Sequence, residues 1–107
     1  MKYEVYLTQD AEQDIFDIYH YIYTNDSQEN ANNIFDNLKK SCLSLSDLAE
    51  RGYIPPELRR INVLNYRQIH YKKYRIIYQI IDTKVFVHCV FDGRRDIKDA
   101  LENRLLR

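Results

Sequence analysis

The sequence contains no tryptophan and only two glycines, and these scarcities exclude several kinds of functional site. Gly52 and Gly93 lie far apart, so the chain has no glycine-rich loop of the kind that cradles phosphate groups. The serine elbow of hydrolases is equally absent. None of His20, His70 and His88 has a cysteine, an aspartate or a second histidine at metal-ligand spacing, so we interpret all three as structural residues. We therefore expect no metal and no other cofactor.

Long apolar runs and a secretion signal are also missing. No run approaches the roughly 20 residues that cross a bilayer, and the first residues lack the apolar segment of a secretory signal. The two cysteines, Cys42 and Cys89, fall at positions of apolar pattern. In a protein that is not secreted, such cysteines are reduced core residues. We expect a cytoplasmic protein with no membrane partner.

The net charge is zero, so neither charge is in excess overall, but acidic and basic residues are unevenly distributed along the chain. Residues 1–58 carry four Lys or Arg against eleven Asp or Glu, whereas residues 59–107 carry twelve against five. Either the second half presents a basic surface to an acidic partner, or the two halves attract each other within the fold. A pI near 6.8 argues against a general nucleic-acid binder.

The stretch from Tyr66 to Asp96 contains three short runs that are rich in β-branched and aromatic residues. In residues 74–81 and 84–91 these residues follow a period of two, which predicts strands. The dipeptide Asp82-Thr83 between those runs predicts a tight turn and an antiparallel hairpin. Residues 1–7 alternate in the same way and predict a first strand.

Two amphipathic helices are predicted between the first strand and residue 50. Thr8 and Ser27 are suitable N-cap residues for them. The first has an apolar stripe broadened by three aromatic residues: Ala11, Ile15, Ile18, Tyr19 and Ile22, with Phe16, Tyr21 and Tyr23 beside it. We expect its carboxylates to form a solvated face: Asp10, Glu12, Asp14 and Asp17. The second helix has its own stripe: Ala31, Ile34, Phe35, Leu38, Cys42, Leu45 and Leu48.

The remaining segments complete a single domain over residues 1–107. Residues 50–60 contain Gly52 and the Pro55-Pro56 pair and are predicted to be irregular. Residues after Gly93 predict a short terminal helix. The element order β-α-α-β-β-β-α indicates an α+β fold in which a helical hairpin packs on one mostly antiparallel sheet.

Basic residues cluster around the predicted sheet. They come from consecutive strands and their connections: Arg67, Lys72, Lys73, Arg75, Arg94 and Arg95. Guanidinium groups gathered on a rigid sheet suit phosphate or carboxylate recognition. The alternative is a scattered solvated edge with local ion pairs, such as Arg95 with Asp92 or Asp96.

The segment YRIIYQIIDTKVFVHCVFDGRRD, preceded by PPEL and YRQIHY and followed by LENRLLR, resembles the RelE/ParE toxin superfamily. The similarity is greatest to its ParE-like, plasmid-stabilisation branch, and the pattern LT-x-x-A-x-x-D-I-x-x-I-x-x-Y-I over residues 7–22 extends it to nearly the whole chain. The resemblance implies the toxin of a bacterial or archaeal type II toxin–antitoxin module. Its partner would be a small DNA-binding antitoxin whose C-terminal segment wraps the toxin.

The two branches of the superfamily have different targets. ParE members inhibit DNA gyrase, whereas RelE members cleave messenger RNA on the ribosome. RelE-like endoribonucleases often carry a Tyr or His-Tyr after the last strand, but residues 97–107 of this chain contain neither residue type. A ribonuclease needs a general acid–base group, and the remaining candidates are His70, Tyr66, Tyr71 and a few carboxylates. The resemblance therefore favours a gyrase inhibitor that is not an enzyme.

Site residues follow from these alternatives. The ParE-like interpretation assigns target contact to the residues after the last strand: Arg94, Arg95, Asp96, Leu101, Arg104, Leu105 and Arg107. It assigns antitoxin contact to the helical hairpin and the basic sheet: Ile15, Tyr19, Ile22, Arg67 and Arg75. The messenger-RNA endoribonuclease alternative assigns phosphate contact to Arg67, Lys72, Lys73, Arg75 and Arg94, with His70 or Tyr71 as the acid–base group. A third alternative is an inactive interaction module.

Overall fold

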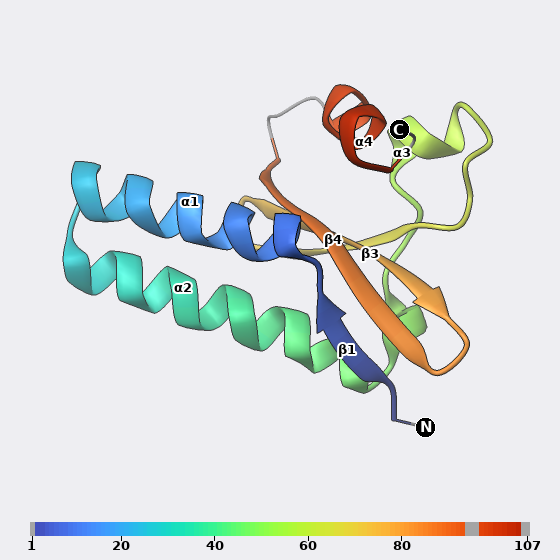
Figure 1. Cartoon of the computed structure of the whole chain (residues 1–107), viewed down its shortest axis with the longest axis horizontal. Coiled ribbons are helices and arrows are strands. Elements are labelled where there is room, and N and C mark those ends of the chain that lie inside the picture. The colour runs from blue at the N-terminus through green and yellow to red at the C-terminus, as the bar shows by residue number, and fades with distance from the viewer. Residues whose placement is uncertain (1, 94–96, 106–107) are drawn as a thin grey trace.

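The computed structural model of the chain describes residues 2–93 and 97–105. It confirms the predicted α+β element order (Figure 1). The elements are β1 Glu4–Leu7, α1 Gln9–Asn25, α2 Gln28–Leu43, α3 Pro56–Arg59, β2 Arg67–Tyr71, β3 Tyr74–Ile81, β4 Lys84–Asp92 and α4 Ile97–Leu105. The segment expected to be irregular contains α3 and a 3-10 turn over Ala49–Arg51, because Pro56 is well suited to the first turn of a helix.

The four strands form one sheet in the order β1-β4-β3-β2. The chain from β2 to β4 is an antiparallel meander, and β1 pairs in parallel with β4. The hairpin turn at Asp82 has φ 56°, and the turn between β2 and β3 has Lys72 at φ 52°. A β-bulge at Ile77/Tyr78 shifts the register between β3 and β4. The sheet is therefore mixed but mostly antiparallel, as the sequence predicted.

Both predicted helix caps are present. The Thr8 hydroxyl accepts a hydrogen bond from the Ala11 amide at 3.1 Å, and the Ser27 hydroxyl accepts one from the Asn30 amide at 3.0 Å. The prediction for Leu48 was wrong, because α2 ends at Leu43 and two 3-10 turns change the phase of the pattern. Leu48 lies in left-handed backbone and its side chain is 73% exposed.

Apolar side chains cover the sheet on both faces. The larger cluster lies between the sheet and the α1–α2 hairpin and includes Ile15, Leu38 and Tyr78. The second cluster joins the opposite face to α3 and α4 through Phe91 and Leu101. Figure 1 shows the helical hairpin and the α3–α4 pair separated by the sheet.

Cys42 and Cys89 are both buried and free, which confirms their expected place in the core. Burial raises the pKa of each thiol to about 12. Within the described residues, every helix is too short or too polar to cross a membrane.

Candidate functional site

An open groove of about 580 Å³ lies between α3 and the ends of β2, β3 and β4. Three of the predicted basic residues, Lys72, Lys73 and Arg75, line it together with His70. Arg67 points elsewhere and donates hydrogen bonds to the backbone carbonyls of Glu50 and Gly52. The structure therefore brings together three of the six predicted basic residues and separates Arg67 from them, while Arg94 and Arg95 lie outside the described residues.

Arg75 is held by neighbouring side chains of the same chain. Its two terminal nitrogens donate to the two carboxylate oxygens of Glu57 at 2.7 and 3.0 Å, and its Nε donates to the Gln68 side-chain oxygen at 2.7 Å. Arg75 is only 8% exposed. The hydrogen bonds from Arg75 hold the pKa of Glu57 below its usual value, so this carboxylate remains ionised at neutral pH. The Arg75 guanidinium is thus occupied by an internal carboxylate.

The two lysines of the groove are more accessible. The Lys73 ammonium lies 3.5 Å from an Asp92 oxygen, but both side chains still contact solvent. The Lys72 ammonium is exposed and lies 5.8 Å from the centre of the Tyr71 ring. Asp92 and Glu57 line the same groove, so its positive charge is largely balanced by carboxylates.

Tyr53 is a groove residue that the sequence did not predict. Its hydroxyl lies 2.6 Å from Nε2 of His70, and the two rings are stacked with centroids 5.9 Å apart. A two-way backbone bridge between Tyr53 and Gln68 places the tyrosine beside β2. This contact joins two segments that are separated in sequence, so no local sequence pattern predicts it.

Gly52 fixes the turn that carries Tyr53. The Tyr78 hydroxyl donates to the Ala49 carbonyl at 2.5 Å and accepts from the Gly52 amide at 3.0 Å. A Cβ at position 52 would lie 2.3 Å from the Tyr78 hydroxyl oxygen and 2.7 Å from the Gln68 carbonyl oxygen. Only a glycine allows this close approach of the loop to the sheet.

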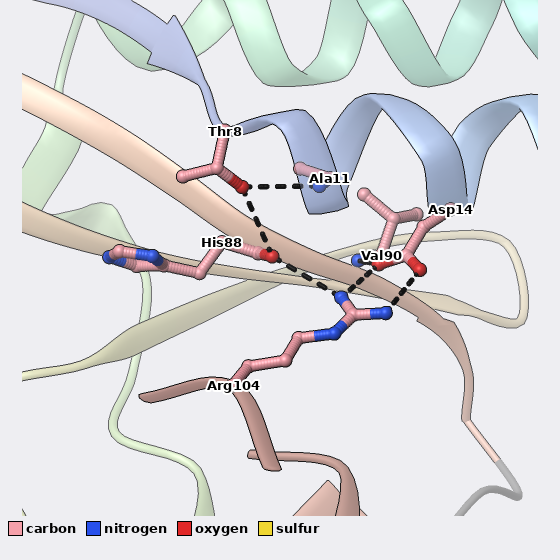
Figure 2. Close-up of polar contacts among 6 residues, drawn as sticks. All are labelled: Thr8, Ala11, Asp14, His88, Val90 and Arg104. Carbon is pink, nitrogen blue, oxygen red and sulfur yellow. Dashed lines mark hydrogen bonds and ion pairs between the residues drawn. The ribbon is translucent and has the colours of Figure 1, made fainter. Parts of the chain in front are cut away.

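The prediction that Asp14 belongs to a solvated face was wrong. Asp14 is 7% exposed and accepts hydrogen bonds from Arg104 of α4 and from the Val90 amide of β4 (Figure 2). Arg104 was predicted to contact the target, but this ion pair occupies its guanidinium and raises its pKa. The Arg104–Asp14 and Arg75–Glu57 pairs both join the acidic half of the chain to the basic half. Attraction within the fold therefore accounts for part of the charge division.

The apolar residues assigned to antitoxin contact differ in exposure. Ile15 is 1% exposed and belongs to the core, whereas Tyr19 and Ile22 are half-buried. The exposed apolar residues of α1 are aromatic: Phe16 at 51%, Tyr21 at 68% and Tyr23 at 48%. The sequence predicted that these three residues broaden the buried stripe, but all three are exposed on the outward side of α1, where polar residues such as Asp17 and His20 separate Phe16 and Tyr23 from Tyr21.

Residues 5–97 match the family described as the ParE toxin of type II toxin–antitoxin systems, parDE. The chain belongs to the ParE toxin family. This match covers most of the chain and confirms the resemblance to the RelE/ParE superfamily that the sequence motifs indicated.

Solved structures of toxin–antitoxin systems share the fold of this ParE-family toxin. The chromosomal ParDE system from P. aeruginosa aligns with a TM-score of 0.71 and 14% identity, over 85% of this chain and 96% of that chain. The RelBE2 complex from Mycobacterium tuberculosis aligns with a TM-score of 0.64 and 20% identity, over 86% of this chain and 99% of that chain. A search of curated protein sequences found no significant match.

Part of the predicted target-contact set of this ParE-family toxin lies outside the described residues. These residues are Arg94, Arg95, Asp96 and Arg107, and the side chain of Leu105 is also outside the description. Leu101 is 1% exposed and packs in the second core. Across residues 2–93 and 97–105, no group of three or more His, Cys, Asp or Glu side chains is arranged to hold a metal ion.

Proposed function

We propose that this ParE-family toxin acts by binding to DNA gyrase and is neutralised by a cognate antitoxin. The observation that carries the proposal is the state of Arg75, whose guanidinium is buried against Glu57 and Gln68. Arg104 is likewise paired with Asp14. Guanidinium groups that already bind internal carboxylates are poorly placed to stabilise the charge on a scissile phosphate. Their engagement supports a protein-binding toxin over a nuclease.

Target contact is assigned to Arg94 and Arg95, the two basic residues between the last strand and α4 in sequence. We expect the double substitution Arg94→Ala and Arg95→Ala to relieve growth inhibition in cells while leaving the thermal unfolding midpoint unchanged. The matched control is Arg59→Ala with Arg60→Ala, an adjacent arginine pair at the end of α3 whose own side chains are exposed. Full toxicity of the Arg94/Arg95 variant would exclude this assignment.

Antitoxin contact is assigned to the outward face of α1, through its exposed aromatic residues Phe16, Tyr21 and Tyr23. A hollow of about 470 Å³ lies beside Tyr21, between the α1–α2 hairpin and the turn that carries Lys73. A protein segment that folds on binding can cover such a face together with the hollow beside it. The complexes formed by the ParDE and RelBE2 neighbours support a partner of this kind.

The antitoxin surface is tested with Tyr21→Ser and with Leu48→Ser, a substitution of another exposed apolar residue. We expect the first to weaken binding of the antitoxin encoded beside the toxin by about tenfold or more, because buried aromatic residues dominate such interfaces. Leu48→Ser should leave the affinity unchanged. If calorimetry gives the same antitoxin affinity for Tyr21→Ser and Leu48→Ser, the antitoxin binds another surface.

A messenger-RNA endoribonuclease is the second candidate, and the Tyr53–His70 contact favours it. An imidazole 2.6 Å from a phenol, in a groove that also holds Lys72 and Lys73, has the parts needed to move the proton of a ribose 2′-hydroxyl. Under this candidate, induction produces mapped cuts in messenger RNA that His70→Gln and Tyr53→Phe both reduce. If messenger RNA stays intact after induction of the toxic wild-type protein, the endoribonuclease function is excluded.

A further inference from the structure

The contact between Asp14 and Arg104 joins two helices that lie at opposite ends of the chain. The two terminal nitrogens of Arg104 donate to the two oxygens of Asp14, at 2.5 and 2.6 Å. The same Asp14 oxygen that faces Arg104 Nη1 also accepts from the Val90 amide at 3.0 Å. Figure 2 shows the guanidinium directed toward α1 across the surface of β4.

The helix α4 has few other means of attachment at its C-terminal end. It is nine residues long, which is too short for a stable helix on its own in water. Its described apolar contacts are Ile97, Ala100 and Leu101, which all precede its last turn. Arg104 lies in that last turn and also stacks over the Phe91 ring, 4.9 Å from its centre. Asp14 is therefore the charged anchor of the C-terminal half of α4 among the described residues, and the His88 carbonyl accepts a further, longer hydrogen bond from Arg104 at 3.4 Å.

We infer that Asp14 is a positioning residue that holds α4 against the sheet through Arg104, and that this attachment of α4 is needed for contact with the target. The functional part of this inference rests on the proposed function, in which Arg94 and Arg95, which shortly precede α4 in sequence, contact gyrase. Asp14 is 7% exposed and binds β4 and α4, so a partner on the surface of α1 has little access to it, whereas Tyr21, on the same side of α1, is 68% exposed. Loss of Asp14 should therefore affect the target and not the antitoxin.

Substitutions at the two positions separate this role from general stabilisation of the fold. Asp14→Asn keeps an oxygen for the Val90 amide but removes the charge that binds Arg104. Arg104→Met keeps an unbranched side chain over Phe91 and removes the guanidinium, and Arg104→Lys keeps the positive charge. Asp17→Asn is the matched control, because it removes one charge from an exposed position three residues further along α1.

The experiment measures three quantities for each full-length variant. They are the rate of amide hydrogen exchange, the inhibition of DNA supercoiling by gyrase, and the affinity for the antitoxin encoded beside the toxin. We expect Asp14→Asn and Arg104→Met to speed exchange of the last α4 amides by about tenfold or more, while the sheet amides stay protected. Gyrase inhibition should fall by about tenfold at unchanged antitoxin affinity. Arg104→Lys should lie between wild type and Arg104→Met, and Asp17→Asn should match wild type.

The outcomes distinguish this inference from the proposed function. Unchanged α4 exchange in both Asp14→Asn and Arg104→Met would overturn the inference. Faster α4 exchange with full gyrase inhibition would overturn its functional part, because α4 placement would then not matter for the target. A wild-type protein that fails to inhibit gyrase would overturn the proposed function, and the exchange data would still decide whether Asp14 holds α4.

Discussion

Replacement of Arg75 by methionine tests whether this arginine is a structural cation. Methionine keeps an unbranched chain over the sheet and removes all three hydrogen bonds to Glu57 and Gln68. If Arg75 is structural, Arg75→Met should destabilise the fold. If it binds a phosphate, the substitution should mainly remove activity.

The size of the effect follows from the burial of the groups. Breaking a fully buried ion pair costs about 3–5 kcal/mol. Here the Arg75 side chain is 10% exposed and that of Glu57 is 25% exposed, so water compensates part of the loss. Gln68 is 1% exposed and would lose the donor to its oxygen, which costs about 1 kcal/mol or more. We expect the free energy of unfolding to fall by about 2–3 kcal/mol.

The same pair predicts a pH dependence. The folded-state pKa of Glu57 lies below its unfolded value, because Arg75 donates hydrogen bonds to the ionised carboxylate. The unfolded chain therefore binds the proton more readily, and the stabilisation is present above the unfolded pKa of roughly 4.3 and is lost as pH falls through the folded value. The difference in stability between wild type and Arg75→Met should shrink below about pH 4.

Urea unfolding at pH 7 measures this directly. With a slope of about 1–3 kcal/mol per molar urea, the midpoint should fall by about 1 M or more. The control is Lys73→Met, whose ion pair with Asp92 is largely exposed and is worth about 0–1 kcal/mol. A wild-type midpoint for Arg75→Met would refute the reasoning and return Arg75 to the set of candidate phosphate ligands.

Three further predictions follow from buried groups. Gly52→Ala should lower the free energy of unfolding, measured in urea, by about 1–3 kcal/mol, because the new methyl group overlaps the Tyr78 hydroxyl. The loss should be smaller in a Tyr78→Phe background. Cys42 and Cys89, with pKa values of about 12, should react with a thiol reagent at pH 8 only after denaturation; fast labelling of the native protein would contradict their burial. Burial lowers the pKa of His88, so the free energy of unfolding should decrease as pH falls through the unfolded-state pKa of roughly 6.5. The His88→Gln variant should show little of this decrease. Identical stability–pH profiles of the variant and wild type would contradict this prediction.

Local sequence patterns predicted the helices, strands and turns well, because these elements depend on interactions between residues close together in sequence. The caps at Thr8 and Ser27, the period-two runs and the turn at Asp82 depend on neighbours within a few residues, and each is present. Leu48 shows the limit of this approach. Its spacing continues the apolar stripe of α2, but the 3-10 turns rotate it outward into solvent.

The site residues were harder to predict because their partners are distant in sequence. Asp14 lies at helical spacing from Ala11 and Ile18, so its place on the buried stripe was visible in principle. Its partner Arg104 was not, because only the packing of α4 on β4 brings the two together. The Tyr53–His70 contact depends in the same way on a long-range backbone bridge.

The most direct test of the central claim is supercoiling by purified DNA gyrase with increasing amounts of this protein, alone and with its antitoxin. The proposed function predicts inhibition with accumulation of cleaved DNA, reversed by the antitoxin. Unaffected gyrase from the host organism, together with cleavage of ribosome-bound messenger RNA by the same preparation, would contradict it and support the endoribonuclease alternative.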